Sequence, residues 1–367
     1  MMIAAPARPH REVKTDFVIE PLFPWALADV AEFIDKQRRA GLGAEDAPAI
    51  ERRLKWLLLE NPLAGDRHPM GYSVRDLWGN IKGVNLCFPS AFLAGERRFF
   101  GLCSGSFFVE PSARPMGFYL FKKYLGAPDY KVFFATTCNA NSVPLWRSLG
   151  GRLIPNSETE YIVPLRLDLM LSAKFKSAFA QFAARCIHRV QHFLTRRTPA
   201  FTIEKCEDWD KLAALFRAHR PPQWISYERS REFLEWRYGS NSPAHPCSLY
   251  VFRDRQGNEG WFALGTLKRG AFKGAMLLDA VWPRDKVSFK DVFSEITAVA
   301  ADSAAALFFR RQPGFNRSEY CRFAISRELD ARTFVISAKN SPQIDLNTFD
   351  YDDNDYIAWM PRPSSAE

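Results

Sequence analysis

The chain has 367 residues with a formal net charge of +9, and 47% of its residues are hydrophobic. This length predicts two domains, each large enough to bury its own core. Its seven cysteines are scattered and contain no C-x-x-C pair, which argues against a disulfide framework or a zinc site and indicates a reducing compartment. No run approaches the ~20 apolar residues of a membrane span, and residues 1–14 lack the apolar core of a signal peptide. We therefore expect a cytoplasmic protein with a disordered N-terminus.

Residues 15–168 are predicted to form one α+β domain. Apolar periodicity and turn signals predict helices at 25–39 and 47–59, strands at 71–74, 81–89 and 99–109, a helix at 118–125, a strand at 130–135, a short helix after Asn139 and a strand at 160–165. This order predicts a mixed, mostly antiparallel sheet flanked by helices.

Positive charge gathers in the next segment, residues 169–198. No acidic residue lies between Asp168 and Glu204, and apolar residues recur there at three- or four-residue spacing. This pattern predicts a basic amphipathic helix that links two domains. The alternatives are that its basic face docks an acidic acyl-carrier protein or an anionic membrane surface. His188 and His192 lie on one face of it without a nearby carboxylate and predict no metal site, and the chain has no nucleic-acid-binding motif.

Residues 199–362 repeat the order of the first half. The pattern predicts strands at 201–205, 248–253, 260–267, 274–282, 304–309 and 355–359, with helices at 209–217, 230–238 and 289–301. We therefore expect a tandem duplication, with two similar domains in one chain.

Two segments of the first half carry the clearest chemical signal. The first contains Val109, Pro111, Arg114 and Gly117 and opens a helix. A helix N-terminus presents unpaired N–H groups and a dipole that favours anions, the arginine adds a fork of donors, and glycine lets a phosphate approach the backbone. This segment predicts a diphosphate-binding loop. Its counterpart in the second half, residues 284–288, contains no glycine, so we expect only the first domain to bind a diphosphate.

The second segment, residues 139–151, follows a strand and predicts a short helix that ends in glycine. Together the two segments resemble the GNAT (N-acetyltransferase-like) acyltransferase superfamily, in its tandem two-domain form. The matching positions are Val109, Pro111, Arg114 and Gly117 in the first segment and Asn139, Ser142, Leu149 and Gly150 in the second. The resemblance covers about residues 15–165, and it implies a second, degenerate GNAT-like domain at 199–362.

The resemblance implies that acetyl-CoA or another acyl-CoA is the donor substrate, with no metal. The residues it places against the acyl-CoA are Phe108, Val109, Arg114, Met116, Gly117, Phe118, Tyr119, Asn139, Ser142 and Trp146. A backbone N–H near Phe108 or Val109 would stabilise the oxyanion, and the Asn139 amide would bind the pantetheine arm.

Three positions depart from the family pattern. Tyr119 stands where the family prefers glycine or alanine, and Gly151 replaces the usual phenylalanine. Trp146 stands where a tyrosine often protonates the leaving thiolate, and an indole cannot deliver a proton at neutral pH. These departures favour an alternative, a catalytically silent GNAT-fold protein that binds a metabolite or a partner.

Glu110 is the carboxylate adjacent to the end of the 99–109 strand and is the candidate general base, provided that burial raises its pKa. Ser104 and Ser106 are expected on the same strand face, where they would hold a water relay, so Ser106 is a second candidate catalytic residue. Cys103 and Cys138 have no histidine in their segments and are interpreted as core thiols.

In the second half, Tyr227, Trp236, Tyr238 and Asp279 are candidate residues of an acceptor pocket. The acidic segment 350–355 lacks the glycine and the glutamate spacing of a calcium loop, and we interpret it as a solvated turn. The sequence thus predicts transfer of an acyl group from acyl-CoA to a small-molecule amine or hydroxyl acceptor, by direct attack in a ternary complex.

Overall fold

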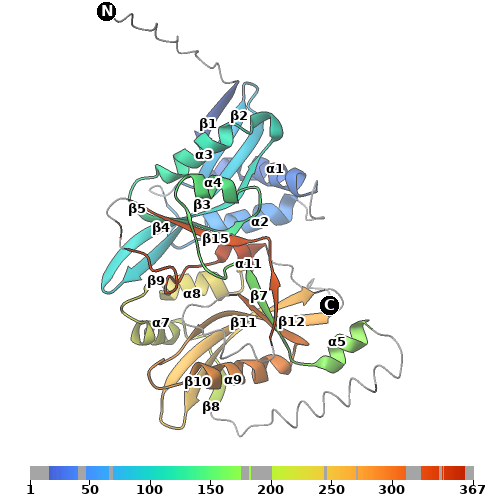
Figure 1. Cartoon of the computed structure of the whole chain (residues 1–367), viewed down its shortest axis with the longest axis vertical. Coiled ribbons are helices and arrows are strands. Elements are labelled where there is room, and N and C mark those ends of the chain that lie inside the picture. Colours follow the sequence, from blue (N-terminus) through green and yellow to red (C-terminus); the bar gives the residue numbers. More distant parts are fainter. Residues whose placement is uncertain are drawn as a thin grey trace, which may run out of the picture.

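The computed structural model describes residues 16–39, 47–65, 69–174, 182, 201–243, 246–269, 272–310, 324–338, 341 and 343–359. Two mixed sheets, each flanked by helices, form the upper and lower parts of the view in Figure 1. The predicted α+β class with two mostly antiparallel sheets is confirmed.

The first sheet is built mainly from the first half of the chain. Its strands, in spatial order, are β1 (Phe17–Pro21), β2 (Gly71–Asp76), β3 (Ile81–Ala94), β4 (Arg97–Val109), β5 (Tyr130–Cys138), β15 (Arg332–Ser337) and β6 (Arg152–Leu153). The strands pair antiparallel except β4 and β5, which are parallel. A short strand, β9 (Ile225–Tyr227), pairs with the end of β3.

Helices cover both faces of this sheet. They are η1 (Pro24–Ala26), α1 (Leu27–Arg39), α2 (Ala47–Leu58), η2 (Pro111–Ala113), α3 (Met116–Leu125) and α4 (Val143–Ser148). The next helix, α5 (Leu167–Lys174), lies beside the second sheet (Figure 1). Because strand side chains alternate between faces, Phe134 packs with Leu54 of α2, whereas its neighbour Phe133 packs with Phe121 of α3 and Trp146 of α4. The sheet is therefore buried on both sides.

The second sheet has the same plan. Its strands, in spatial order, are β14 (Ile325–Glu328), β7 (Thr159–Pro164), β13 (Ala306–Arg310), β12 (Phe272–Val281), β11 (Glu259–Arg269), β10 (Cys247–Asp254) and β8 (Phe201–Lys205). Its helices are α7 (Trp209–His219), α8 (Arg231–Tyr238) and α9 (Phe289–Ala301). Each begins at a side-chain cap, since Asp208, Ser230 and Ser288 each accept a hydrogen bond from the N–H three residues later.

Besides the short β9, each half of the chain gives one strand to the interior of the other half's sheet. β7 lies between β13 and β14 in the second sheet, and β15 lies between β5 and β6 in the first. In Figure 1 the green β7 stands among orange strands, and the red β15 lies beside β5. The two positions are equivalent, because each donated strand pairs with the strand that forms the parallel step of its sheet, β4–β5 or β12–β13.

Two sequence-based assignments need correction. The predicted strand at 160–165 exists as β7, but it completes the second sheet, because Tyr161 and Val163 pack in the core around Phe309. The predicted strand at 355–359 is instead a helix, α11 (Asn354–Ala358). A run this short has no periodicity that separates a strand from a helical turn. The division of the chain into domains at residue 168 stays a prediction. One strand from before this residue, β7, lies in the second sheet, and one from after it, β15, lies in the first.

The predicted basic helix at 169–198 begins as α5, but residues 175–181 and 183–200, with His188 and His192, lie outside the described residues. Among the helices that the structure describes, none is both long and apolar enough to cross a membrane.

Candidate functional site

The parallel strands β4 and β5 pair over only part of their length, so their last residues are not paired with each other. The two strands pair from Phe100 and Tyr130 to Cys103 and Phe134. Beyond this point β4 runs on to Val109 and β5 to Cys138. We call these separated ends, residues 104–109 and 135–138, the β4–β5 wedge.

A β-bulge lies in the wedge. Two residues of β4, Ser106 and Phe107, lie opposite the single residue Asn85 of β3. Ser106 has a φ of 48°, in the left-handed region that non-glycine residues rarely adopt. Its buried hydroxyl has no hydrogen-bond partner among the described residues. Strain and an unsatisfied polar atom at one position are features that cluster at functional sites.

The bulged end of β4 presents a backbone donor to the wedge. The Glu110 N–H donates to the Lys82 carbonyl of β3 at 2.8 Å. Successive N–H groups of a strand point to opposite edges, so the N–H of Val109 points toward β5. Because β5 has separated from β4 by this point, the Val109 N–H faces the wedge.

The start of α3 lies directly beyond β4 and has open donors. Among the described residues, the N–H groups of Met116 and Phe118 have no acceptor, and the exposed Arg114 has no ion-pair partner. The Gly117 N–H, in contrast, donates to the Arg114 carbonyl at 3.1 Å. The donors that an anion would meet here are therefore the Arg114 guanidinium and the Met116 and Phe118 amides.

Neither Gly117 nor Tyr119 closes this helix start. A methyl group on Gly117 would make only ordinary contacts, 3.5 Å to Val109 and 3.6 Å to Phe107, so packing does not require glycine here. Tyr119 is 56% exposed, and its ring packs edge-on against that of Phe118 with 5.9 Å between centroids. More than half of the large side chain that departs from the family pattern is thus open to solvent.

A carboxylate from the far end of the chain lies in the wedge. Asp355 of α11 is 1% exposed, and its Oδ2 accepts a hydrogen bond of 2.5 Å from the Thr137 hydroxyl of β5. Its Oδ1 accepts a bond of 3.0 Å from the Trp359 indole N–H. Burial raises the pKa of Asp355 above its ordinary value, and the hydrogen bonds from Thr137 and Trp359 offset part of that effect.

Gly105 of β4 makes room for this carboxylate. A Cβ atom on Gly105 would lie 2.6 Å from Asp355 Oδ1 and 2.5 Å from the Phe88 ring, both too close for any side chain. The absence of a side chain at Gly105 therefore lets Asp355 reach the backbone of β4 just before the bulge.

The open helix start and Asp355 lie on opposite faces of the first sheet. Met116 and Phe121 of α3 pack with Phe107. Gly105 and Cys103 face the other way, toward Asp355 and the core that contains Trp359. A molecule passing through the wedge would therefore meet the donors of α3 on one face and a carboxylate on the other.

Comparison with known proteins identifies this architecture. No protein-family profile and no curated protein matches the chain. Among solved structures, a GCN5-related N-acetyltransferase from Anabaena variabilis superposes with a TM-score of 0.55 at 10% identity, over 87% of this chain and 72% of that one. Saccharomyces cerevisiae N-myristoyltransferase with bound myristoyl-CoA superposes with a TM-score of 0.52 at 13% identity, over 94% and 86%. The chain has the GNAT fold. The resemblance inferred from the Arg114 and Asn139 segments is thereby confirmed at the level of fold.

The second GNAT element, at the end of β5, is locally ordered by its own side chains. The Asn139 Oδ1 accepts from the N–H groups of Asn141 and Ser142 at 3.1 and 3.2 Å, so this side chain caps the turn before α4. Its Nδ2 has no partner among the described residues. Trp146 is 2% exposed and packs edge-on against Phe121, which makes it a core residue.

Glu110 lies at the edge of the site rather than in the wedge. Its carboxylate contacts the ammonium groups of Lys82 at 3.4 Å and Lys36 at 3.7 Å. Ser104 donates to Asn85 at 2.6 Å and does not share a relay with Glu110, because the bulge changes which face the following residues occupy.

The two cysteines of the wedge region are core residues, as expected. Cys103 and Cys138 are 1% and 3% exposed. Burial raises the pKa of the Cys103 thiol well above its ordinary value and that of Cys138 to about 12, so both stay protonated at neutral pH. Among the described residues, no cluster of His, Cys, Asp and Glu side chains is arranged to hold a metal ion.

The equivalent position of the second sheet is filled by the protein itself. Asp279 on β12 receives two hydrogen bonds from Arg229, at 2.8 and 2.9 Å, and a third of 2.6 Å from Tyr227. Arg229 also donates to Asp350 at 2.7 Å. Although burial opposes the charged form, the Arg229 guanidinium holds the pKa of Asp279 below its usual value. Tyr227 and Asp279 thus belong to a buried ion-pair network, which includes Tyr238 at 3.2 Å from Asp279.

The loop after β12 also lacks an open anion site. The Arg284 guanidinium lies 3.7 Å above the Trp282 ring and 4.6 Å from the Trp224 ring. Burial between these rings lowers the pKa of Arg284 to about 10. The expectation that only the first domain binds a diphosphate stays a prediction.

The interpretation of residues 350–355 as a solvated turn is wrong. Asp350, Asp352 and Asp355 are 7%, 2% and 1% exposed. Each is buried because it has a specific partner: Arg229 for Asp350, Ser90 for Asp352 and Thr137 for Asp355. A single sequence contains no local signal for these partners, since they lie more than a hundred positions away.

Proposed function

We propose that the protein is an acyltransferase that moves an acyl group from acyl-CoA to an amine or hydroxyl acceptor by direct attack. The observation that carries the proposal is the position of Asp355. It places a buried carboxylate at the β4–β5 wedge, on the face opposite the open N-terminus of α3. The likeness to N-acetyltransferases and to an N-myristoyltransferase with bound myristoyl-CoA supports the same reaction class.

The donor would be held from the α3 face. The Arg114 guanidinium and the Met116 and Phe118 amides would bind the diphosphate, because they are unpaired donors at the positive end of a helix. The pantetheine arm would lie along the wedge beside Asn139 and Ser142. Its thioester would then reach the bulge, where the Val109 N–H would stabilise the oxyanion.

The acceptor would approach from the face of Asp355. Its nitrogen or oxygen attacks the thioester carbonyl carbon, and its proton passes to the Asp355 carboxylate. The tetrahedral intermediate then collapses: the carbon–sulfur bond breaks, and the CoA thiolate leaves with the electron pair and takes a proton from water. A base with a raised pKa suits this role, because an ordinary carboxylate is too weak at neutral pH. We therefore propose Asp355, rather than Glu110, as the general base.

Titration of the intact protein with acetyl-CoA and with longer acyl-CoAs, followed by calorimetry, tests the donor site. Assays of thiol release with a panel of amines and alcohols test the reaction. We expect binding of at least one acyl-CoA and release of its thiol. Folded protein that binds no acyl-CoA of any length would rule the proposal out.

A catalytically silent GNAT-fold binding protein is the second candidate. Two observations favour it: Trp146 is buried where the family often has a proton-donating tyrosine, and the Gly117 N–H is paired within the chain. Acyl-CoA binding without thiol release across the acceptor panel, with no effect of Asp355→Asn on binding, is the result that would select this candidate.

A further inference from the structure

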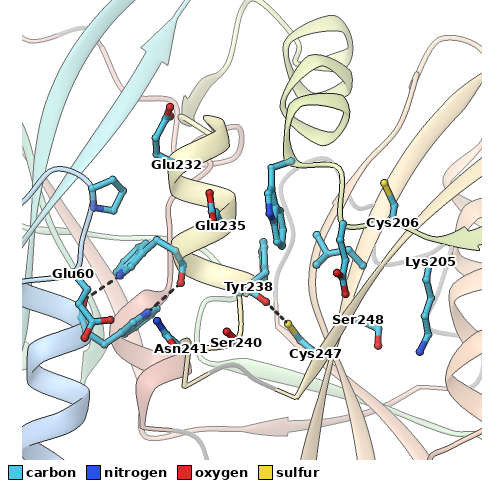
Figure 2. A pocket seen from close by; sticks show the side chains of 17 residues that line it. Glu60, Lys205, Cys206, Glu232, Glu235, Tyr238, Ser240, Asn241, Cys247 and Ser248 are labelled. Carbon is cyan, nitrogen blue, oxygen red and sulfur yellow. Dashed lines mark hydrogen bonds between the residues drawn. The ribbon is translucent and has the colours of Figure 1, made fainter.

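A groove of about 760 Å³ opens beside α8, away from the wedge. It is lined by the end of α2 and the residues after it, by α8, and by the start of α7 with the neighbouring ends of β8 and β10 (Figure 2). The lining residues include Trp56, Glu60, Lys205, Glu207, Trp209, Glu232, Glu235, Trp236 and Tyr238. Trp236 and Tyr238, two of the residues proposed from the sequence for an acceptor pocket, are thus part of a real groove.

Two stacked tryptophans lie where α2 and α8 meet at one side of the groove. The Trp56 and Trp236 rings are stacked with 4.4 Å between centroids and 14° between planes. Each indole N–H donates to the backbone carbonyl of the other residue, at 3.1 and 3.0 Å. Trp56 itself is buried, so the aromatic surface that the groove offers a ligand comes from the half-buried Trp236 and Trp209, and aromatic faces attract cations.

The groove is also negatively charged, in a chain whose net charge is +9. It is lined by one ammonium, that of Lys205, and by four carboxylates, those of Glu60, Glu207, Glu232 and Glu235. Four negative charges and one positive charge give a local net charge of −3. All four glutamates are exposed, and none forms an ion pair with a described residue. The negative charge of the groove is therefore only partly offset by Lys205 among its described lining residues.

We propose that this groove binds the alkylammonium part of the acceptor, which would be a cationic amine with at least two ammonium groups. The proposal rests on the proposed acyltransferase function and names its substrate class. Unpaired carboxylates beside tryptophan faces are suited to an ammonium on a methylene chain, since the charge and the aliphatic part are both accommodated. Neutral alcohols would gain nothing from this surface.

The groove is connected to the wedge by a short chain of contacts. On α2, Arg53 lies one helical turn before Trp56, and its guanidinium lies 5.3 Å from the Trp359 ring. The Trp359 indole in turn donates to Asp355. On α8, Arg237 lies between the groove residues Trp236 and Tyr238 and donates to Asp353 at 2.6 Å. The groove and Asp355 are thus linked through side chains of α2 and α8 that contact residues 353–359.

Binding of two probes to the full chain tests the proposal: spermidine, a small polyamine, and a short lysine-rich peptide. We expect one or both to bind, and we expect E207Q/E235Q to weaken that binding by about tenfold or more, with a strong dependence on salt. The control E96Q/D302N removes the same charge from exposed positions outside the groove. Binding by spermidine alone identifies a small polyamine as the acceptor, whereas binding by the peptide alone identifies a peptide amine.

Two binding results overturn the proposal: binding of neither probe, or equal affinities for E207Q/E235Q and the control. Both variants should keep the wild-type unfolding midpoint, since exposed Glu→Gln changes remove no packing. Failure of the acyltransferase proposal is seen separately. Spermidine binding that depends on Glu207 and Glu235 without any acyl-CoA binding would keep the groove and remove the reaction. Thiol release with spermidine at the same KM in E207Q/E235Q and in the wild type would keep the reaction and exclude the groove as the acceptor site.

Discussion

Thr137, near the end of β5, donates a 2.5 Å hydrogen bond to Asp355, which lies 218 positions later in the chain. This bond fixes the carboxylate at the point where β4 and β5 separate. It also links the C-terminal segment to the site of the first sheet, so the site is complete only when both ends of the fold are in place.

Asp355→Asn should reduce kcat by about 10²–10⁴-fold, because an amide cannot accept the proton of the acceptor. KM for acyl-CoA should stay unchanged, since the donor residues lie on the other face of the sheet. The kcat of the wild type should fall as pH drops through the raised pKa of Asp355. The kcat of the variant should show no such fall on the acid side of its pH profile. Glu110→Gln is the matched control. A kcat that drops with Glu110→Gln and not with Asp355→Asn would reverse the assignment of the base.

Arg114→Ala should weaken acyl-CoA binding by about 1–3 kcal/mol, the range for a lost charge-assisted hydrogen bond. Calorimetric titration measures this change directly. Arg255→Ala removes an exposed arginine from a turn of the second sheet and should have no effect. Equal affinities of the two variants would show that no diphosphate binds at the start of α3.

Asp352→Asn should stabilise the protein at pH 8. Burial raises the pKa of Asp352 to about 6, from an ordinary value of 3.8, so the folded state binds its proton more tightly than the unfolded state. This stabilising contribution is complete below pH 3.8 and is lost as pH rises through about 6. A shift of this size is about 3 kcal/mol. Urea unfolding at pH 8 should therefore favour the variant by up to that amount, with little difference near pH 4. A variant less stable than wild type at pH 8 would contradict this account.

Arg229→Ala should destabilise the protein by about 3–5 kcal/mol, because it leaves Asp279 and Asp350 as uncompensated buried charges. Arg231→Ala offers a close comparison, since it breaks an exposed 3.0 Å ion pair with Asp210 and should cost at most about 1 kcal/mol. Denaturant midpoints of both variants give the comparison. Similar midpoints would mean that the buried network contributes no more to stability than an exposed ion pair.

Local patterns in the sequence determined the helices, the antiparallel strands and the segment with Arg114 and Gly117, because each depends on residues close together in the chain. From these, the fold class and the resemblance to the GNAT superfamily were predicted. The exchange of β7 and β15, the role of Gly105 and the burial of Asp355 were decided by the tertiary structure alone. Each depends on groups more than a hundred positions apart, and a short acidic segment has the same composition whether water or a buried partner satisfies its charges. From sequence alone, the candidate general base is therefore the carboxylate nearest to the strand end, Glu110, whereas packing brings a second candidate, the more distant Asp355, to the wedge.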